Sequence, residues 1–228
     1  MRAVYIENLS VEESYHLRDE PFHHLVHVAR VDRGEGILLL DGVGLAIECE
    51  VMSFNKREIV LKKKHHETKN LTFAIDIALG MPKKDALDLC LKQMVELGVS
   101  NCYLVRSQYS QMKLPEKERI HKQLISALEQ SNSPRLTKVV SSNFDEIDYG
   151  QYDQVLVLDS QHPSDASKGP VSGRYLLIIG PEGGFSPEEF SFFNTLPNLK
   201  RLNLPTPIMR TPTALSCGVG VILQRLMD

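Results

Sequence analysis

The sequence has 228 residues, of which 42% are hydrophobic and 24% charged, a composition typical of a globular protein with a packed core. Its 26 lysines and arginines against 29 aspartates and glutamates give a net charge of −3, which excludes a protein that coats nucleic acid by overall charge but not one with a local basic face. No apolar run approaches the roughly 20 residues of a membrane span, and the four scattered cysteines favour a reducing compartment. We therefore expect a cytoplasmic protein without a membrane anchor.

The first 70 residues have the pattern of short β-strands separated by turns. Segment 41–44 (Asp-Gly-Val-Gly) has the residues of a tight turn. Apolar runs with the length and composition of strands occupy residues 26–31, 37–40, 46–51 and 59–61. We therefore expect a small β-barrel domain over residues 1–70.

Positive charge is concentrated at the end of this region. Residues 54–69 contain six lysines and arginines against two acids. Such a run can be a solvated edge strand that lysines protect from pairing with another chain. It can equally be an RNA-binding face, because phosphate contacts need clustered cations on one surface. The charge pattern alone leaves both interpretations open.

After residue 70 strands and helices alternate. We expect strands at 71–79, 102–105, 154–158, 175–179 and 199–204. Helices are expected at 83–97, from about residue 115, and at the C-terminus, where Leu215, Val219, Ile222 and Leu226 are one turn apart. This alternation predicts a mostly parallel sheet covered by helices, which would form a second domain over residues 71–228.

A glycine-rich loop follows the fourth of these strands. Residues 180–189 read G-P-E-G-G-F-S-P-E-E, in which Ser186 and Glu189 predict a capping box at the start of a helix. The loop lacks the lysine of a phosphate-binding loop, and the carboxylate of Glu182 would repel a diphosphate. A neutral or cationic ligand such as the sulfonium S-adenosylmethionine fits better, although a glycine turn can also serve chain reversal alone. Ligands of open parallel sheets bind at this end of the strands.

A second stiff loop follows the fifth strand. Residues 204–214 contain Pro205, Pro207 and Pro212, which restrict the backbone and suit the wall of a pocket. Arg210 is the strong cation of this segment. Its guanidinium suits a phosphate or carboxylate, and a structural salt bridge is the alternative.

These two loops resemble the ribosomal RNA small subunit methyltransferase E (RsmE) family, which belongs to the SPOUT superfamily. The resemblance rests on I-G-P-E-G-G-F-S at 179–186 and M-R-T-P-T-A at 209–214. It extends to E-L-G-V at 96–99 and A-L-E-Q-S at 127–131 in the middle of the chain. Near the start it includes Arg2, His24-Leu25, Arg30, Gly34 and residues 41–44, which are similar to the family's PUA-like RNA-binding domain.

The resemblance implies a fold and a reaction. The fold is a PUA-like β-barrel over residues 1–70, followed by a SPOUT-type α/β domain over 71–228 with a C-terminal trefoil knot. The reaction is S-adenosylmethionine-dependent methylation of N3 of one uridine in 16S rRNA of the small ribosomal subunit, by a homodimer. A catalytically silent RNA-binding relative and a ribose 2′-O-methyltransferase of the same superfamily are the alternatives.

The resemblance also implies site residues. The cofactor pocket would be lined by Leu158, Ile179, Gly180, Pro181, Glu182, Gly183, Gly184, Leu204, Ile208, Met209, Arg210, Thr211 and Ala214. RNA would contact Arg2, His24, Arg30, Lys56, Arg57, Lys62, Lys63 and Lys64. Arg210 and Arg2 are the candidate catalytic residues, as stabilisers of charge on the uracil or as phosphate anchors. No base is identified, because Glu182 is expected to hold its loop by accepting backbone N–H groups.

The sequence departs from the family pattern at several positions, which are Pro205, Pro207, Pro212, Tyr109 and Ser133. Tyr109 and Ser133 stand where the family has arginines, so phosphate contacts to the substrate are the property these changes affect most. His23, His24 and His27 resemble a metal-ligand cluster, but no fourth ligand is evident and methyl transfer needs none. We expect no metal.

Overall fold

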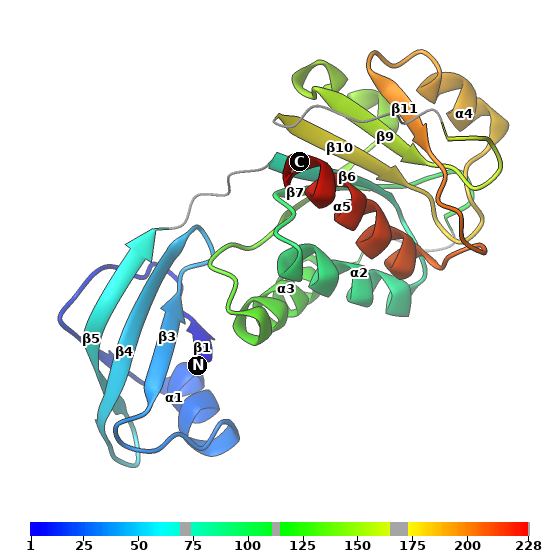
Figure 1. Cartoon of the computed structure of the whole chain (residues 1–228). Helices are drawn as coiled ribbons and strands as arrows, with labels where there is room; N and C mark the ends of the chain where they lie inside the picture. Colours follow the sequence, from blue (N-terminus) through cyan, green and yellow to red (C-terminus); the bar gives the residue numbers. More distant parts are fainter. Residues whose placement is uncertain (69–73, 111–114, 165–172, 228) are drawn as a thin grey trace. The chain divides into compact units, whose positions relative to one another are not determined.

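The computed structural model describes residues 1–68, 74–110, 115–164 and 173–227 (Figure 1). These form two compact units. The first consists of residues 1–70 with 124–136, and the second of residues 71–123 with 137–228. Residues 124–136 belong to the first unit although they lie far from it in the sequence. One contact that joins them is the hydrogen bond from the backbone N–H of Tyr5 to Glu129 Oε1, at 3.0 Å. The expected assignment of functional domains to residues 1–70 and 71–228 stays a prediction.

The first unit is built on a five-stranded mixed sheet in the order β1-β3-β4-β5-β2. Its strands are β1 (Arg2–Tyr5), β2 (Ser14–Leu17), β3 (Gly36–Leu40), β4 (Leu45–Phe54) and β5 (Ile59–Thr68). The expected turn at 41–44 is confirmed, since Asp41 Oδ1 accepts the backbone N–H groups of Val43, Gly44 and Leu45 at 2.7–2.9 Å. The strands around residues 37–61 were thus predictable from their turns, whereas β1 and β2 were missed.

The strand expected at 26–31 is wrong. This segment follows helix α1 (Asp19–His23) and is mostly a π-helical turn (His24–Val28). Phe22 and Leu25 are buried in the core of the unit, and Val26 and Ala29 pack against it. These four apolar residues recur at spacings of three and four, which is the period of a helix, and that periodicity outweighs the strand preference of the valines.

The second unit contains six parallel strands in the order β11-β9-β10-β6-β7-β8. They are β6 (Ala74–Gly80), β7 (Asn101–Val105), β8 (Lys138–Ser142), β9 (Gln154–Leu158), β10 (Arg174–Ile179) and β11 (Leu199–Leu202). The helices of the chain beyond residue 80 are α2 (Lys84–Glu96), α3 (Lys117–Ser131), α4 (Pro187–Phe193) and α5 (Thr211–Met227). The predicted parallel sheet is therefore confirmed, although β8 was missed and residues 71–73 of the expected first strand lie outside the described residues.

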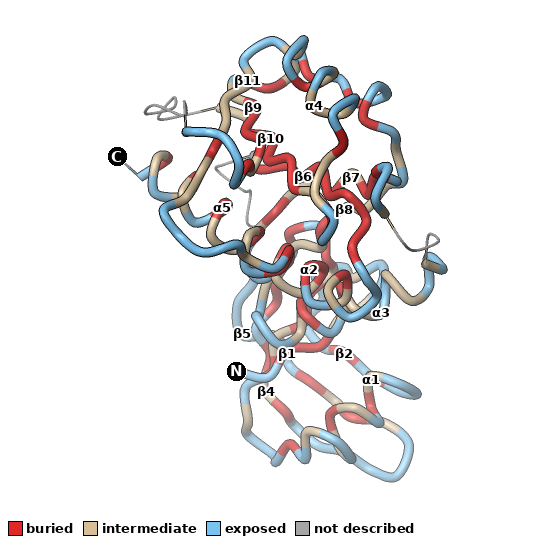
Figure 2. Tube along the Cα trace, turned by 90° about the vertical axis from the view of Figure 1, so that its right-hand side faces the viewer, coloured by how far each residue is buried: buried red, intermediate tan, exposed pale blue. Residues whose placement is uncertain are grey.

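The central strands are apolar along their length, because helices and loops cover both faces of the sheet (Figure 2). The exception is Asp76 on β6, which is fully buried. Its carboxylate accepts from Tyr152 Oη at 2.7 Å, Arg174 Nη2 at 3.0 Å and Asn101 Nδ2 at 2.8 Å. A buried carboxylate is stable only with such partners, so this network serves the fold near the amino-terminal end of β6.

No helix in the described residues combines the length and apolarity needed to cross a membrane.

Candidate active site

A cavity of about 380 Å³ lies at the carboxyl ends of three neighbouring strands of the second unit. Its walls are the segments that follow β9, β10 and β11, together with the start of α5. The volume falls within the range of roughly 300–1,000 Å³ found for small-molecule sites. The carboxyl ends of parallel strands are also where open α/β sheets bind ligands.

All thirteen residues expected to line a cofactor pocket lie in the wall of this cavity. They come from the ends of β9 and β10, from loop 180–186, from loop 203–210 and from the start of α5. The structure therefore brings together two loops that α4 and β11 separate in the sequence. Nothing bound marks their roles, so the assignment of individual residues to a ligand stays a prediction.

Loop 180–186 ends in the predicted capping box. Glu189 donates its backbone N–H to Ser186 Oγ at 3.2 Å, and Glu189 Oε2 accepts the Ser186 N–H at 2.8 Å. The second carboxylate oxygen of Glu189 accepts the backbone N–H of Gln108 at 3.0 Å. The same side chain therefore starts α4 and fixes the loop after β7 beside the glycine loop.

The carboxylate of Glu182 is engaged by the backbone of a neighbouring loop. Both of its carboxylate oxygens face the backbone N–H of Lys83, at 3.1 and 3.2 Å, immediately before α2. This agrees with the expectation that Glu182 holds the loop by accepting a backbone N–H. The loops after β6 and β10 are thereby joined.

The two glycines at 183 and 184 are needed for different reasons. A Cβ on Gly183 would lie 2.9 Å from Cβ of Tyr109, so Gly183 permits the close packing of the two loops. Gly184 has a φ of +72°, which disfavours side chains, and a Cβ there would meet nothing within 4 Å. Open space beside bare backbone in a cavity wall suits a ligand that binds through main-chain groups.

Sequence reasoning missed Asp159, whose side chain is 1% exposed and which lines the cavity just after β9. Asp159 Oδ1 accepts the backbone N–H of Gln161 at 2.9 Å, while Oδ2 lies 2.7 Å from His162 Nδ1 and 3.4 Å from Arg201 Nε. This carboxylate therefore fixes the shape of the loop after β9. The other wall residues missed are Ser160, Gln161, Phe185, Phe190, Leu202, Asn203, Thr206 and Pro207. A lone Asp after a strand gave no signal, and Arg201, one of its partners, comes from another strand.

Arg210 borders the cavity and is exposed. Among the described residues no carboxylate forms an ion pair with it, which argues against the alternative of a structural salt bridge. Pro212 is buried at the second position of α5, where a proline fits because its missing N–H has no helical partner. The Thr211 hydroxyl donates to the carbonyl of Gly180 at 3.4 Å, so α5 begins next to the end of β10. The expected trefoil knot stays a prediction.

The residues expected to bind RNA all lie in the first unit, and so does Arg2, the second catalytic candidate. Arg2 forms an ion pair with Glu35 at 3.2 Å. Lys63 Nζ lies 2.6 Å from Glu13 Oε1, and Lys64 Nζ lies 2.7 Å from Glu50 Oε2. Arg30, Lys56, Arg57 and Lys62 are exposed, and His24 is half-buried. The lysine run on β5 therefore carries less free charge than its sequence suggests.

No group of three or more His, Cys, Asp or Glu side chains is placed to hold a metal ion in the part of the chain that the structure describes. His23 and His27 are neighbours, with ring centroids 5.1 Å apart.

Comparison with known proteins adds to this geometry. A model of the RNA methyltransferase domain matches residues 69–223, and a model of the RNA methyltransferase PUA domain matches residues 17–64. Together with the cavity at the carboxyl ends of a parallel sheet, these matches define an RNA methyltransferase with an attached PUA domain.

Individual relatives narrow the class. Ribosomal RNA small subunit methyltransferase E 2 of Borreliella burgdorferi is 31% identical, over 91% of this chain and 89% of its own. The enzyme named ribosomal RNA small subunit methyltransferase E in Bacillus subtilis is 25% identical, over 94% and 93%. The crystal structure of the Neisseria gonorrhoeae enzyme of that name, bound to S-adenosylmethionine, is 25% identical, covers 98% of this chain and 97% of its own, and has a TM-score of 0.83. The chain belongs to the RsmE family.

Proposed function

We propose that this protein methylates N3 of a uridine in 16S rRNA of the small ribosomal subunit, with S-adenosylmethionine as the methyl donor. The observation that supports this most is the cavity itself, where loops 180–186 and 203–210 meet at the end of the sheet. The Neisseria gonorrhoeae relative, similar over nearly the whole chain, is bound to S-adenosylmethionine.

The cavity fits this donor by size and by chemistry. Glu182, the carboxylate of the glycine loop, is turned to Lys83, and Asp159 is engaged by His162 and Arg201. Bare backbone at Gly184 leaves space for an adenosine or methionine group to approach closely. When bound, S-adenosylmethionine supplies a methyl group already activated by its sulfonium sulfur.

The protein's own groups then have two tasks. The walls of the cavity position the target nitrogen in line with the methyl group, and such alignment can lower a barrier by about 7–11 kcal/mol. The uracil N3 proton must also leave, and a cation near O2 or O4 stabilises the charge that develops. Arg210, exposed at the cavity edge without a carboxylate partner among the described residues, is the candidate for this second task.

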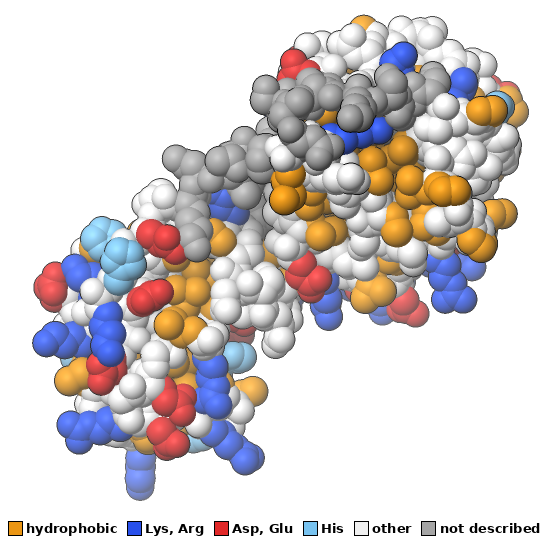
Figure 3. All heavy atoms as spheres, viewed as in Figure 1, with side chains coloured by type: hydrophobic (Ala, Val, Ile, Leu, Met, Phe, Trp, Pro, Cys, Tyr) orange, Lys and Arg blue, Asp and Glu red, His pale blue; other side chains and the backbone are white. Residues whose placement is uncertain are grey.

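We further propose that residues 1–70 bind the RNA and that residues 71–228 carry the reaction, in a homodimer. The PUA match within the first of these segments supports the RNA-binding role. Hydrophobic side chains gather on the face of the second unit that carries α2 and α5 (Figure 3). Leu89 on α2 is 51% exposed. A second copy of the chain that covers this face would account for the exposed hydrophobic side chains. Light scattering after size-exclusion chromatography measures the oligomeric state directly.

Mass spectrometry of nucleosides from small-subunit rRNA tests the reaction. In cells that lack this gene, 3-methyluridine should disappear from 16S rRNA and return when the purified protein and S-adenosylmethionine are added to the subunits. Recovery of a ribose-methylated nucleotide instead would identify a 2′-O-methyltransferase. Failure to bind S-adenosylmethionine in isothermal titration would identify a catalytically silent relative.

A further inference from the structure

Tyr109 is an exposed aromatic side chain at the edge of the glycine loop. Its relative exposure is 44%, and among the large exposed hydrophobic residues described in the second unit it is the aromatic one. Exposed aromatic rings are the groups on which RNA-binding proteins stack unpaired bases.

Hydrogen bonds hold the backbone of the turn that carries Tyr109. Ser107 and Ser110 close the turn around it, with Ser110 N–H donating to the Ser107 carbonyl at 2.9 Å and Ser107 N–H to Ser110 Oγ at 3.1 Å. Gln108 N–H donates to Glu189 at 3.0 Å, which fixes the turn to the start of α4. A platform presented by a fixed loop loses little conformational entropy when a ligand binds.

The position of Tyr109 relates it to the reaction. Its Cβ packs against Gly183, a residue of the cavity wall, while much of the ring remains accessible. A uridine that reaches the cavity must be unstacked from its neighbours. Tyr109 therefore lies beside the cavity that this uridine must enter.

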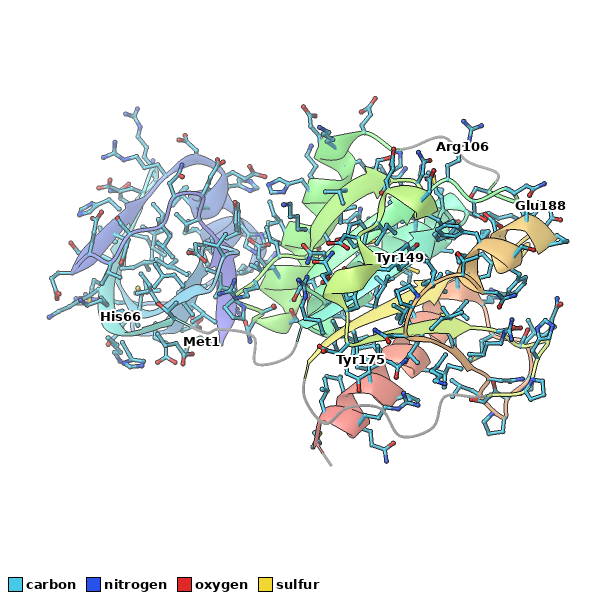
Figure 4. The ribbon with its side chains drawn as sticks, turned by 90° about the horizontal axis from the view of Figure 1, so that it is seen from above. Met1, His66, Arg106, Tyr149, Tyr175 and Glu188 are labelled. Carbon is cyan, nitrogen blue, oxygen red and sulfur yellow. The ribbon has the colours of Figure 1, made fainter. Side chains whose placement is uncertain are left out.

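Arg106 adds a cation to the same loop. It directly follows β7, three residues before Tyr109, and is exposed. Figure 4 shows it extending away from the sheet. An aromatic ring and a guanidinium three residues apart on one loop suit a nucleotide, because the ring can stack on a base while the cation contacts a phosphate.

We propose that Tyr109 is a stacking platform for an unpaired base of the RNA substrate, with Arg106 as a phosphate contact beside it. The proposal rests on the proposed function for the identity of the substrate. It gives a positive role to a position where the sequence lacks the arginine of the family pattern, since a stacking contact replaces a charged one.

Four variants test this proposal. Tyr109→Ala removes the ring but keeps the Cβ, the atom nearest Gly183, so the glycine loop keeps its packing. Tyr109→Phe keeps the flat ring, and Tyr109→Leu keeps apolar bulk without it. Arg106→Ala removes the neighbouring charge. The probes are S-adenosylmethionine and an unmodified transcript of the 16S rRNA decoding region, and binding of each is measured separately from methyl transfer.

We expect Tyr109→Ala and Tyr109→Leu to weaken binding of the transcript roughly 5- to 100-fold, the equivalent of one lost stacking contact. Tyr109→Phe should stay within about twofold of the parent protein, and S-adenosylmethionine affinity should be unchanged in all three. The salt dependence of RNA binding should change only in Arg106→Ala, where the slope decreases by about 0.7.

The inference is overturned if Tyr109→Ala binds the transcript as the parent does. Equal losses in Tyr109→Phe and Tyr109→Ala would also overturn it, because they would assign the effect to the hydroxyl. A parallel loss of S-adenosylmethionine affinity would instead give Tyr109 a structural role under Gly183. If the parent protein binds the transcript but transfers no methyl group to subunits, the proposed function fails while the binding comparison still decides the role of Tyr109.

Discussion

Glu182 in the glycine loop accepts the backbone N–H of Lys83 with both carboxylate oxygens, at 3.1 and 3.2 Å. The contact joins two residues 99 positions apart and connects the start of α2 to the wall of the cavity. Lys83 is the N-cap residue of α2, and Ala86 at the third helical position has no side-chain acceptor, so the carboxylate of Glu182 supplies the acceptor for the N-cap N–H that a glutamate at the third position provides in a capping box. A residue in this arrangement positions the site, and it is poorly placed to accept a proton from the substrate.

We therefore predict that Glu182→Ala lowers the free energy of unfolding by about 1 kcal/mol, the usual effect of removing a helix cap, and weakens S-adenosylmethionine binding. Glu182→Gln retains one acceptor oxygen and should recover most of both properties and most of kcat. Thermal unfolding, isothermal titration and single-turnover rates measure the three quantities. A glutamine variant that folds and binds the donor normally but has lost activity would show that Glu182 is the base after all.

Local signals in the sequence predicted the parts of the site that local physics determines. The capping box of Ser186 and Glu189 lies within four residues, so its pattern alone predicted the start of α4. The cavity wall on both loops followed from the family resemblance. Asp159 escaped prediction because Arg201, one of its partners, is 42 residues away and reaches it only in the folded sheet.

The wrong predictions from the sequence, the strand at 26–31 and the free charge of the lysine run, have a similar cause. The valines at 26 and 28 favour a strand locally, but Phe22 and Leu25 fit the core of the first unit only on a helix. The charge of Lys63 and Lys64 could be counted, yet the carboxylates opposite them come from β4 and from the segment before β2. Ion pairs between residues far apart in the sequence cannot be predicted from a single sequence.

Asp159 provides a second prediction. Asp159→Ala removes the acceptor for Gln161 N–H and leaves Arg201 and His162 without their carboxylate, so we expect a loss of about 1–3 kcal/mol in unfolding free energy. The donor should bind more weakly because the loop forms part of the cavity wall. Ser160→Ala, at the next position of the wall, is the control. It should change neither the melting temperature nor the affinity for S-adenosylmethionine measured by isothermal titration. Identical behaviour of the two variants would remove Asp159 from the site.

Two glycines of α5 give a matched pair. A Cβ on Gly218 would lie 2.7 Å from Leu177 Cδ2 and 3.2 Å from Leu158 Cδ1, whereas one on Gly220 would meet nothing within 4 Å. We predict that Gly218→Ala destabilises the protein by about 1–3 kcal/mol through overpacking and weakens donor binding through Leu158, which lines the cavity. Gly220→Ala should stabilise it by up to about 1 kcal/mol, because alanine is the better helix former. Chemical denaturation of both variants compares them, and a stable Gly218→Ala protein would show that α5 packs less closely on β10.

The cysteines should differ sharply in reactivity. Burial raises the pKa of Cys49 and of Cys90 to about 12, and it raises the pKa of the fully buried Cys102 as well. A raised pKa keeps these thiols protonated at pH 8, and the thiolate is the form that alkylating reagents modify. Burial also prevents the reagent from reaching them. In the folded protein we expect iodoacetamide to modify Cys217, which is half-buried, and none of the other three. Mass spectrometry should count four labels in denaturant, and rapid labelling of Cys49 without it would contradict the packing of the first unit.

The lysine run on β5 yields the last prediction. Hydrogen bonding and charge from Lys63 lower the pKa of Glu13, and those from Lys64 lower the pKa of Glu50, so both carboxylates stay ionised well below neutral pH. At pH 7 each therefore neutralises a lysine that could contact RNA. Replacing both acids by glutamine releases two positive charges on this strand without altering its lysines.

If this strand binds RNA, the double variant Glu13→Gln with Glu50→Gln should bind the 16S transcript more tightly. The plot of log affinity against log salt should become steeper by up to about 0.7 for each lysine released. Lys62→Ala should weaken binding in both backgrounds. An unchanged salt slope in the double variant would assign the lysines to the alternative role, in which they protect the strand from pairing with another chain.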